Sequence, residues 1–229
     1  MLSVIIPTLN EKKNILKLSD KLSKISFIAE VIFIDDNSND GTFKEIRKVK
    51  HKKIKGYLRK GVSKDLSKSV LMGVQKSKYQ NILVMDGDMQ HDSRYIITMW
   101  KSFNRSKFDL IIASRFSNKK LVGNLGFLRS AISHIAISFI NFFFGKKTTD
   151  PLSGFFICKK KIITNYKKNF FSRGYKILFD ILYNSKNDLK IKDINITFKK
   201  RYFEKSKFNS RIILLFFMQI LFTKFVVKK

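Results

Sequence analysis

The chain has 229 residues, of which 44% are hydrophobic, enough to form the core of one α/β domain. Its formal net charge is +30, from 47 basic and 17 acidic residues, and this charge favours anionic partners such as nucleic acid, a membrane surface or phosphorylated substrates. The abundance of Lys, Asn, Ile and Phe is also what an AT-rich coding bias produces. Nucleic-acid binders usually carry Arg-rich clusters or a recognisable module; neither is visible, so no nucleic acid is expected as a partner.

The chain contains one cysteine, Cys158, which excludes a disulfide framework and a cysteine-based zinc site. A single cysteine fits a reduced, cytosol-facing compartment. Because the first predicted strand begins within a few residues of Met1, no signal peptide is expected.

The first half of the chain alternates apolar runs with amphipathic segments. Strands are predicted over residues 2–6, 30–34, 54–58, 82–85 and 109–114. Helices are predicted from Glu11, with Asn10 as the capping residue, and over residues 64–78 and 93–103, and residues 43–53 form a basic amphipathic segment. This alternation predicts an α/β fold with a mostly parallel, doubly wound sheet and helices on both faces.

Polar residues follow three of the predicted strands. Asp86, Gly87 and Asp88 come directly after the apolar run 82–85, and polar stretches also follow the first two strands. In open α/β sheets, ligands bind at the carboxyl ends of the strands. Two carboxylates at that place suit Mg²⁺ or Mn²⁺, which commonly combines one or two carboxylates with substrate phosphates. The alternative is a turn in which Asp and Gly serve the backbone alone.

The second half contains two strongly apolar segments, residues 131–144 and 212–227, both with basic flanks. As a helix, residues 212–227 would span about 24 Å. They are fewer than the roughly 20 residues that a bilayer crossing needs. Both segments are expected to form amphipathic helices in a membrane interface. Core helices or a dimer seam are the alternatives. The predicted division is a main domain over residues 1–207 and a membrane-associated helix over residues 208–229.

Seven motifs, in order, resemble one family of enzymes. VIIPTLNE (4–11), VIFIDDNSNDGT (31–42), VMDGDMQHD (84–92) and ASRF (113–116) resemble the inverting GT-A glycosyltransferases of family 2. DPLSGFF (150–156), GYKILFDIL (174–182) and FKKRYFEKSK (198–207) resemble its dolichyl- or polyprenyl-phosphate mannosyltransferase branch, the dolichol-phosphate mannose synthase type. The resemblance runs from about residue 3 to 207 and implies the GT-A, or nucleotide-diphospho-sugar transferase, fold.

The resemblance also implies roles for individual residues. Those expected to hold the nucleotide are Pro7, Leu9, Glu11, Ile34 and Asp36. Those expected to hold the metal ion and the donor diphosphate are Asp86, Gly87, Asp88 and Gln90. Basic residues expected at the diphosphate or at the acceptor phosphate are Arg115, Arg129, Arg201 and Lys207. Of all these, Asp88, Arg115 and Arg201 are expected to act in catalysis.

The chain departs from the family pattern at several positions. Leu9 stands where the family usually has Tyr, and Asp65 stands where a Gly normally begins a helix. Glu204 replaces a Gly, and Asp180 replaces a Glu. These changes concern loop geometry and acceptor fit more than the catalytic core.

The function implied is inverting transfer of a hexose, mannose from GDP-mannose, onto a polyprenyl or dolichyl phosphate. The enzyme would be peripheral, on the cytoplasmic face of a membrane with anionic lipids. A phosphate acceptor is already anionic, so no general base is required; His91 is interpreted as a solvated loop residue rather than a base. The alternatives are a family 2 transferase for UDP-glucose or another acceptor, and a non-catalytic protein that binds anionic lipid or RNA.

Overall fold

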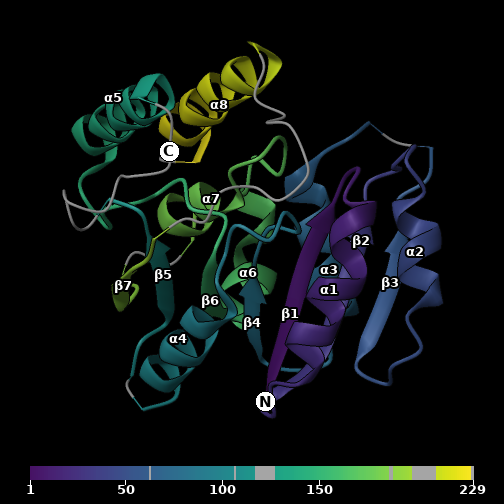
Figure 1. Ribbon diagram of the computed structural model, residues 1–229. Coiled ribbons are helices and arrows are strands. Elements are labelled where there is room, and N and C mark those ends of the chain that lie inside the picture. Colours follow the sequence, from purple (N-terminus) through teal and green to yellow (C-terminus); the bar gives the residue numbers. More distant parts are fainter. Residues whose placement is uncertain (62, 106, 117–126, 186–187, 198–209, 228–229) are drawn as a thin grey trace.

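The computed structural model describes residues 1–61, 63–105, 107–116, 127–185, 188–197 and 210–227. The side chains of residues 127–131 and 210–212 are also outside the description. In the N-terminal half, strands and helices alternate as predicted (Figure 1): β1 (Leu2–Thr8), α1 (Lys12–Ser23), β2 (Ile28–Asp35), α2 (Thr42–Lys48), β3 (Ile54–Leu58), α3 (Leu66–Lys76), β4 (Asn81–Val84), α4 (Ser93–Arg105) and β5 (Leu110–Ser114).

The C-terminal half adds two strands and several helices. In chain order these are α5 (Phe127–Phe144), β6 (Phe156–Lys159), α6 (Lys160–Tyr166), the 3-10 turn η2 (Lys167–Asn169), α7 (Ile177–Tyr183), β7 (Ile191–Asn195), α8 (Ser210–Phe222) and the π-helical turn η3 (Thr223–Val227).

The described strands form one sheet in the order β3-β2-β1-β4-β6-β5-β7. Its neighbouring strands are parallel except where β6 pairs antiparallel with β4 and β5. The register sets Thr8 opposite Asp35, so β1 and β2 end at the same level. The predicted α/β fold with a mostly parallel sheet is confirmed.

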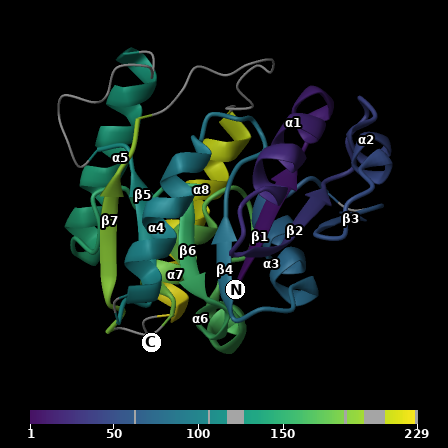
Figure 2. The ribbon, with the colours of Figure 1, turned by 60° about the horizontal axis from the view of Figure 1, so that its bottom comes forward.

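Helices cover both faces of the sheet, as Figures 1 and 2 show. Successive side chains of a strand point to opposite faces, and β1 illustrates this: Val4 and Ile6 belong to the core beneath α1, α2 and α4. Ile5, between them, belongs to the core beneath α3, α6 and α7. The apolar run of each central strand is therefore explained by burial on both sides, as is typical of parallel sheets.

The basic amphipathic segment over residues 43–53 contains most of α2, which ends at Lys48, and a loop leads to β3. One local prediction was wrong. Asn10 does not cap α1, which begins at Lys12 and has no side-chain cap. Instead Asn10 has a φ of 53° and its side-chain oxygen accepts a hydrogen bond from the backbone N–H of Asn39 at 3.1 Å. The short amide side chain bridges two loops rather than capping the helix. Asn side chains can hydrogen-bond nearby backbone groups in either way.

Helices α5 and α8 lie side by side at the end of the molecule where the parallel strands terminate (Figure 1). Phe139 and Phe217 join them, with ring centroids 6.3 Å apart, and Nζ of Lys224 lies 4.0 Å from the ring centroid of Phe143. Within the described ranges, no helix is both long and apolar enough to cross a membrane.

Candidate active site at the carboxyl end of the sheet

Hydrogen bonds join the loops that follow β1 and β2. The backbone N–H of Asp36 donates to the carbonyl oxygen of Thr8 at 2.8 Å. The backbone N–H of Asn10 donates to Oγ of Ser38, also at 2.8 Å. These bonds hold the loop that contains Leu9 and Glu11 beside Asp36, as the sequence predicted for strands whose carboxyl ends meet at one edge.

The Asp86-Gly87-Asp88 turn lies directly against the β1 loop. A Cβ at Gly87 would be 3.2 Å from Cγ2 of Thr8 and 3.6 Å from Cγ of Glu11, so the missing side chain permits this approach. Asp88 is buried, and its Oδ1 accepts a hydrogen bond from the backbone N–H of Gln90 at 3.1 Å. The geometry thus brings Glu11, Asp86, Asp88 and Gln90 into one region.

The carboxylate of Asp86 remains 37% exposed while protein groups surround its other side. A Cβ at Gly154 would lie 2.9 Å from its Oδ2, so glycine makes room for the carboxylate. Burial alone would raise the pKa of Asp86, but the hydrogen bond with His91 and the charges of Lys176 and Arg115 lower it below its ordinary value. Asp86 is therefore ionised at neutral pH.

The interpretation of His91 as a solvated loop residue was wrong. Its side chain is fully buried, and its ring lies tilted against Phe155 with centroids 4.5 Å apart. Nε2 of His91 lies 3.3 Å from Oδ2 of Asp86. The ring therefore supports the carboxylate rather than facing water.

The residues present fit a divalent cation. Asp86 and Asp88 offer hard oxygen atoms, and the side chain of Asp86 stays 37% exposed although Gly154 packs against its carboxylate. Among the described residues, no group of three or more His, Cys, Asp or Glu is arranged to hold a metal ion. Mg²⁺ commonly combines one or two protein carboxylates with phosphate oxygens of a ligand, and two carboxylates are what this turn offers.

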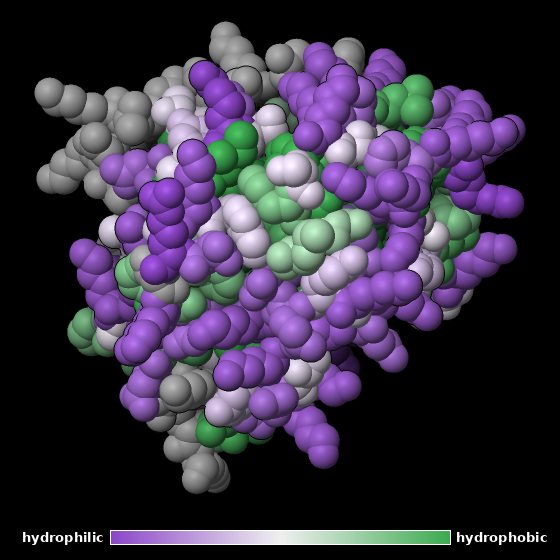
Figure 3. Space-filling view, turned by 90° about the horizontal axis from the view of Figure 1, so that it is seen from below, coloured by the Kyte–Doolittle hydropathy of each residue, from purple (hydrophilic) through white to green (hydrophobic). Residues whose placement is uncertain are grey.

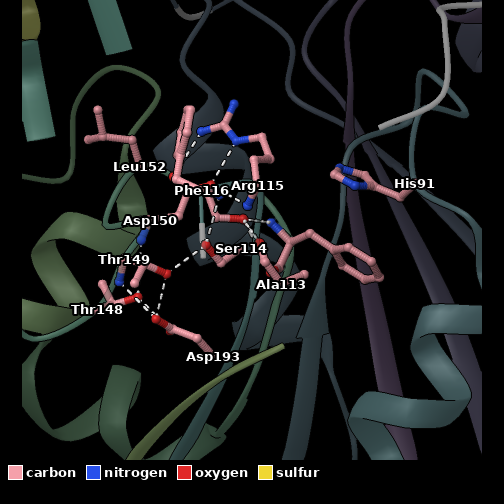
Figure 4. A network of polar contacts seen from close by, with 12 residues as sticks. His91, Ala113, Ser114, Arg115, Phe116, Thr148, Thr149, Asp150, Leu152 and Asp193 are labelled. Carbon is pink, nitrogen blue, oxygen red and sulfur yellow. Dashed lines mark hydrogen bonds and ion pairs between the residues drawn. The ribbon is translucent and has the colours of Figure 1, made fainter. Parts of the chain in front are cut away.

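Arg115 follows β5 and is fixed by a buried carboxylate. Its Nε donates to Oδ2 of Asp150 at 2.7 Å and its Nη2 donates to Oδ1 at 2.9 Å, a two-pronged pair that sets the plane of the guanidinium (Figure 4). Burial would lower the pKa of Arg115, but the charges of Asp150 and Asp86 raise it. Arg115 is 14% exposed, and its charge acts on Asp86.

A network of hydroxyl groups holds the segment that carries Asp150 (Figure 4). Oγ1 of Thr148 donates to Oδ1 of Asp193 at 2.6 Å, and Oγ1 of Thr149 donates to Oδ2 at 2.7 Å. The hydroxyls of Ser114 and Thr149 lie 2.7 Å apart. Strands β5 and β7 are thereby tied to the turn before β6, which keeps Asp150 in place under Arg115.

Asp36 belongs to a second buried cluster. Nη1 of Arg59 and the backbone N–H of Asp65 both donate to its carboxylate. Burial raises the pKa of Asp36, against the opposing hydrogen bond from Asp65 and the charge of Arg59. Asp65 caps α3 by accepting from the backbone N–H of Lys68 at 3.0 Å, and its φ of −158° is extended. The position where the family usually has glycine therefore takes Asp without a left-handed backbone.

Other predicted residues lie around this region or beyond the description. Pro7 and Ile34 face each other across β1 and β2, and Ile34 is a fully buried core residue that packs against Gly73 of α3. Leu9 is half-buried. Arg129 lies in the first turn of α5, but its side chain is not described, and Arg201, Glu204 and Lys207 lie outside the described residues.

An α/β sheet of this topology, with a carboxylate motif at the end of β4 and a fixed arginine after β5, is the organisation of a GT-A glycosyltransferase. Residues 3–167 match the model of the family described as glycosyl transferase family 2, and the chain belongs to that family.

Two curated relatives carry the same activity in their names. The chain is 30% identical over 215 residues to the dolichol-phosphate mannosyltransferase of Pyrococcus furiosus, covering 92% of this chain and 60% of that protein. It is 28% identical over 233 residues to the dolichol-phosphate mannosyltransferase of Saccharomyces cerevisiae, covering 95% of this chain and 85% of that protein. The chain therefore spans less than two thirds of the Pyrococcus protein. These matches confirm the resemblance that the seven motifs indicated.

A solved structure of low identity shares the fold. It is glucosyl-3-phosphoglycerate synthase of Mycobacterium tuberculosis in complex with Mn²⁺, uridine diphosphate and glucosyl-3-phosphoglycerate. The TM-score is 0.70 at 16% identity, with 90% of this chain and 73% of that chain covered.

Three residues beside the site had no role assigned from sequence. Asp150 and Lys176 stand inside motifs that carried the resemblance, DPLSGFF and GYKILFDIL, and Arg59 follows the third predicted strand. Their pairing partners are distant in sequence: Arg115 for Asp150 and Asp36 for Arg59. The signal available in the sequence was the presence of these charged residues in or near the motifs, because a charged side chain that becomes buried requires a partner.

Proposed function

We propose that this protein is an inverting glycosyltransferase that moves mannose from GDP-mannose onto a polyprenyl or dolichyl phosphate. The names of the Pyrococcus and Saccharomyces relatives support the sugar and the acceptor. The observation that carries the proposal is that a half-buried, ionised Asp86 lies within the influence of the fixed positive charge of Arg115. A carboxylate for a metal ion beside an arginine is the pairing that a departing diphosphate requires.

The reaction forms a bond between the anomeric carbon of the sugar and an oxygen of the acceptor phosphate. The bond from that carbon to the donor diphosphate breaks, and its electron pair leaves with GDP. A divalent cation, Mg²⁺ or Mn²⁺, held by Asp86 and Asp88 with Gln90 nearby, would neutralise the diphosphate when bound. Arg115, together with Arg201 and Lys207, would stabilise charge on the diphosphate and the acceptor phosphate.

No residue has to remove a proton in this reaction, because the acceptor phosphate is anionic at neutral pH. The surroundings of His91 agree with that view: its ring is buried and lies next to Asp86. Placement of the two substrates in line is then the main task of the site.

Membrane association at the cytoplasmic face is part of the proposal. Helices α5 and α8 expose large apolar side chains, including Phe142 at 82% and Leu214 at 61%. The opposite end of the molecule is covered mostly by hydrophilic residues (Figure 3). An apolar face combined with a net charge of +30 suits binding to a surface of anionic lipids, where a prenyl acceptor resides.

Transfer of glucose from UDP-glucose is the second candidate, favoured by the uridine diphosphate complex of the Mycobacterium enzyme. Titration of the protein with GDP-mannose and with UDP-glucose, each with Mg²⁺, distinguishes the two donors. The proposal predicts tighter binding of GDP-mannose, and Asp88→Ala is expected to weaken it. Preferential binding of UDP-glucose would support the second candidate. RNA binding with a steep salt dependence, and no binding of any nucleotide sugar, would favour a non-catalytic role.

A further inference from the structure

Helix α8 carries polar side chains on its buried side. Gln219 is 1% exposed, and Thr223, which begins the turn η3, is fully buried. The described side chains that α8 exposes are all apolar, among them Phe217 at 50% and Leu221 at 55%. A surface helix of a globular protein usually has the reverse arrangement, with its polar side chains outside. Apolar packing alone therefore does not account for Gln219 and Thr223.

These two side chains fasten α8 to α7 and to the loop before it. Nε2 of Gln219 donates a hydrogen bond to the carbonyl oxygen of Lys176, the residue that precedes α7, at 3.1 Å. Oγ1 of Thr223 accepts a hydrogen bond from Nδ2 of Asn184, directly after α7, at 2.9 Å. Buried polar contacts of this kind can fix the register of packed elements, because a shift would leave a donor or an acceptor unpaired. The buried side of α8 thus has a defined partner at each end of α7.

The α7 loop (residues 171–176) is held in one conformation. The backbone N–H groups of Phe171 and Ser172 donate to the buried carboxylate of Asp180 at 3.2 and 3.1 Å. Ser172 has a φ of 53°, a conformation that non-glycine residues keep only where their surroundings impose it. The ring of Phe171 also packs against that of Phe222 in α8, with centroids 5.5 Å apart. Helices α7 and α8 therefore fix the α7 loop together.

Gly174 of the α7 loop joins α8 to the start of α3. Its φ of 84° is in the left-handed region, and a Cβ at this position would lie 3.4 Å from Cβ of Leu215 in α8. Its backbone N–H donates to Oδ2 of Asp65 at 2.8 Å, and its carbonyl oxygen accepts from the backbone N–H of Ser67 at 2.9 Å. The α7 loop is thereby bonded to α3 while it packs against α8.

Asp65 connects the α7 loop to Asp36. Oδ2 of Asp65 accepts from Gly174, and its Oδ1 accepts from the backbone N–H of Lys68. The backbone N–H of Asp65 donates to the carboxylate of Asp36. Nη1 of Arg59 donates to that carboxylate and also to the carbonyl oxygen of Asp65, the latter at 3.0 Å. One residue therefore joins the loop that α8 holds to the carboxylate that is expected to hold the nucleotide.

We propose that the buried side of α8 belongs to the nucleotide-binding machinery and that Gln219 is a positioning residue, which acts on Asp36 through the α7 loop and Asp65. The inference rests on the proposed function in taking Asp36 to hold the nucleotide. Binding groups hold a ligand well only when their own supports are fixed. The two sides of α8 then have different tasks, lipid contact outside and support of the nucleotide site inside.

Calorimetric titration with GDP and Mg²⁺, in detergent without lipid, measures nucleotide binding apart from sugar transfer. Gln219→Met keeps the size of the side chain but removes the donor, and it is expected to weaken GDP binding about three- to tenfold. Met218→Gln, at the neighbouring position on the exposed side of α8, is the matched control and is expected to leave the GDP affinity unchanged. The same series with UDP covers a uridine donor. Equal affinity of Gln219→Met and the wild-type protein would overturn the proposal.

Two further measurements separate positioning from a general loss of stability. Phe103→Leu, in the core beneath α4, is expected to lower the midpoint of thermal unfolding without changing the GDP affinity. Asp65→Asn is expected to weaken GDP binding, because an amide has one oxygen for the two backbone N–H groups. In that background Gln219→Met is expected to add less than about twofold, because both residues act along one path. Additive losses, or an equal loss in Phe103→Leu, would overturn the positioning role.

Failure of this proposal differs from failure of the proposed function. Mannose transfer by the wild-type protein, together with unchanged GDP binding by Gln219→Met, would refute the role of Gln219 and leave the function standing. GDP binding that depends on Gln219, in a wild-type protein that transfers no sugar, would do the reverse. Wild-type protein that binds neither GDP nor UDP would overturn both.

Discussion

Arg115 and Asp150 show how a single pair of side chains prepares the site. Asp150 is fully buried, so its charge would be costly without a partner, and the guanidinium of Arg115 meets both of its oxygen atoms. The same contact fixes the guanidinium plane beside Asp86. Stability and the orientation of a functional group are therefore linked in one contact, and a change at Asp150 affects both.

We predict that Asp150→Asn lowers the rate of sugar transfer about 10- to 100-fold, as is typical for residues that orient a functional group. The neutral side chain keeps its shape but loses the ion pair, so the guanidinium is less well fixed. The free energy of unfolding is expected to fall by about 1–3 kcal/mol. Asp20→Asn, which removes an exposed ion pair with Lys24, is the control and should alter neither quantity. Equal effects of the two substitutions would refute the orienting role.

The strands themselves are joined by a buried carboxylate far from the site. Glu30 of β2 accepts a hydrogen bond from Oγ of Ser3 at 2.7 Å and from the backbone N–H of Lys78 at 2.6 Å, and it pairs with Lys55 of β3. Burial alone would raise the pKa of Glu30, but these bonds lower it below its ordinary value of 4.5. The central strands are thus held together by one ionised group as well as by the hydrogen bonds between their backbones.

We predict that Glu30→Gln reduces the free energy of unfolding by about 1–3 kcal/mol at pH 7. Because the pKa of Glu30 is lowered in the folded protein, its ionised form contributes fully above pH 4.5, and the contribution is lost as the pH falls through the folded pKa. Urea unfolding of both proteins at pH 7 and near pH 3 measures the difference. If the difference in the free energy of unfolding between wild type and variant is as large near pH 3 as at pH 7, this assignment is contradicted.

Periodicity in the sequence was sufficient for the first five strands, because each is an apolar run that burial on both faces requires. It did not predict β6, whose residues Phe156–Lys159 follow a motif with no alternating pattern, or β7, whose residues are mostly half-buried or exposed. The carboxyl-end cluster was predictable because parallel strands end at one edge. The pairs Arg115–Asp150 and Arg59–Asp36 were not, since each joins residues from different loops. Periodicity cannot specify such contacts.

At the scale of the whole molecule, the apolar face of α5 and α8 stands out against a strongly basic chain. Its exposed side chains lie on helices that also supply buried groups to the core, such as Ile140 and Ile220. The outer side of these helices is therefore not needed for packing among the described residues. Membrane contact, proposed above, gives that outer side a role.

We predict that the double variant Phe142→Ser, Leu214→Ser binds anionic lipid vesicles at least about tenfold more weakly, because each large apolar side chain contributes about 1.5–3 kcal/mol on leaving water. The matched control is Leu16→Ser, Ile97→Ser, which removes two exposed apolar side chains from α1 and α4. Co-sedimentation with vesicles measures the effect. A control that loses as much binding as the double variant would argue against a specific face.

The most direct measurement is the transfer of labelled mannose from GDP-mannose to a mild-acid-labile lipid, in the presence of a polyprenyl phosphate. The proposed mechanism predicts transfer by the wild-type protein with Mg²⁺ or Mn²⁺, none after chelation, and a loss of at least about a hundredfold in Asp88→Ala. Undiminished transfer by Asp88→Ala, or no transfer by the wild-type protein from any nucleotide sugar, would contradict it.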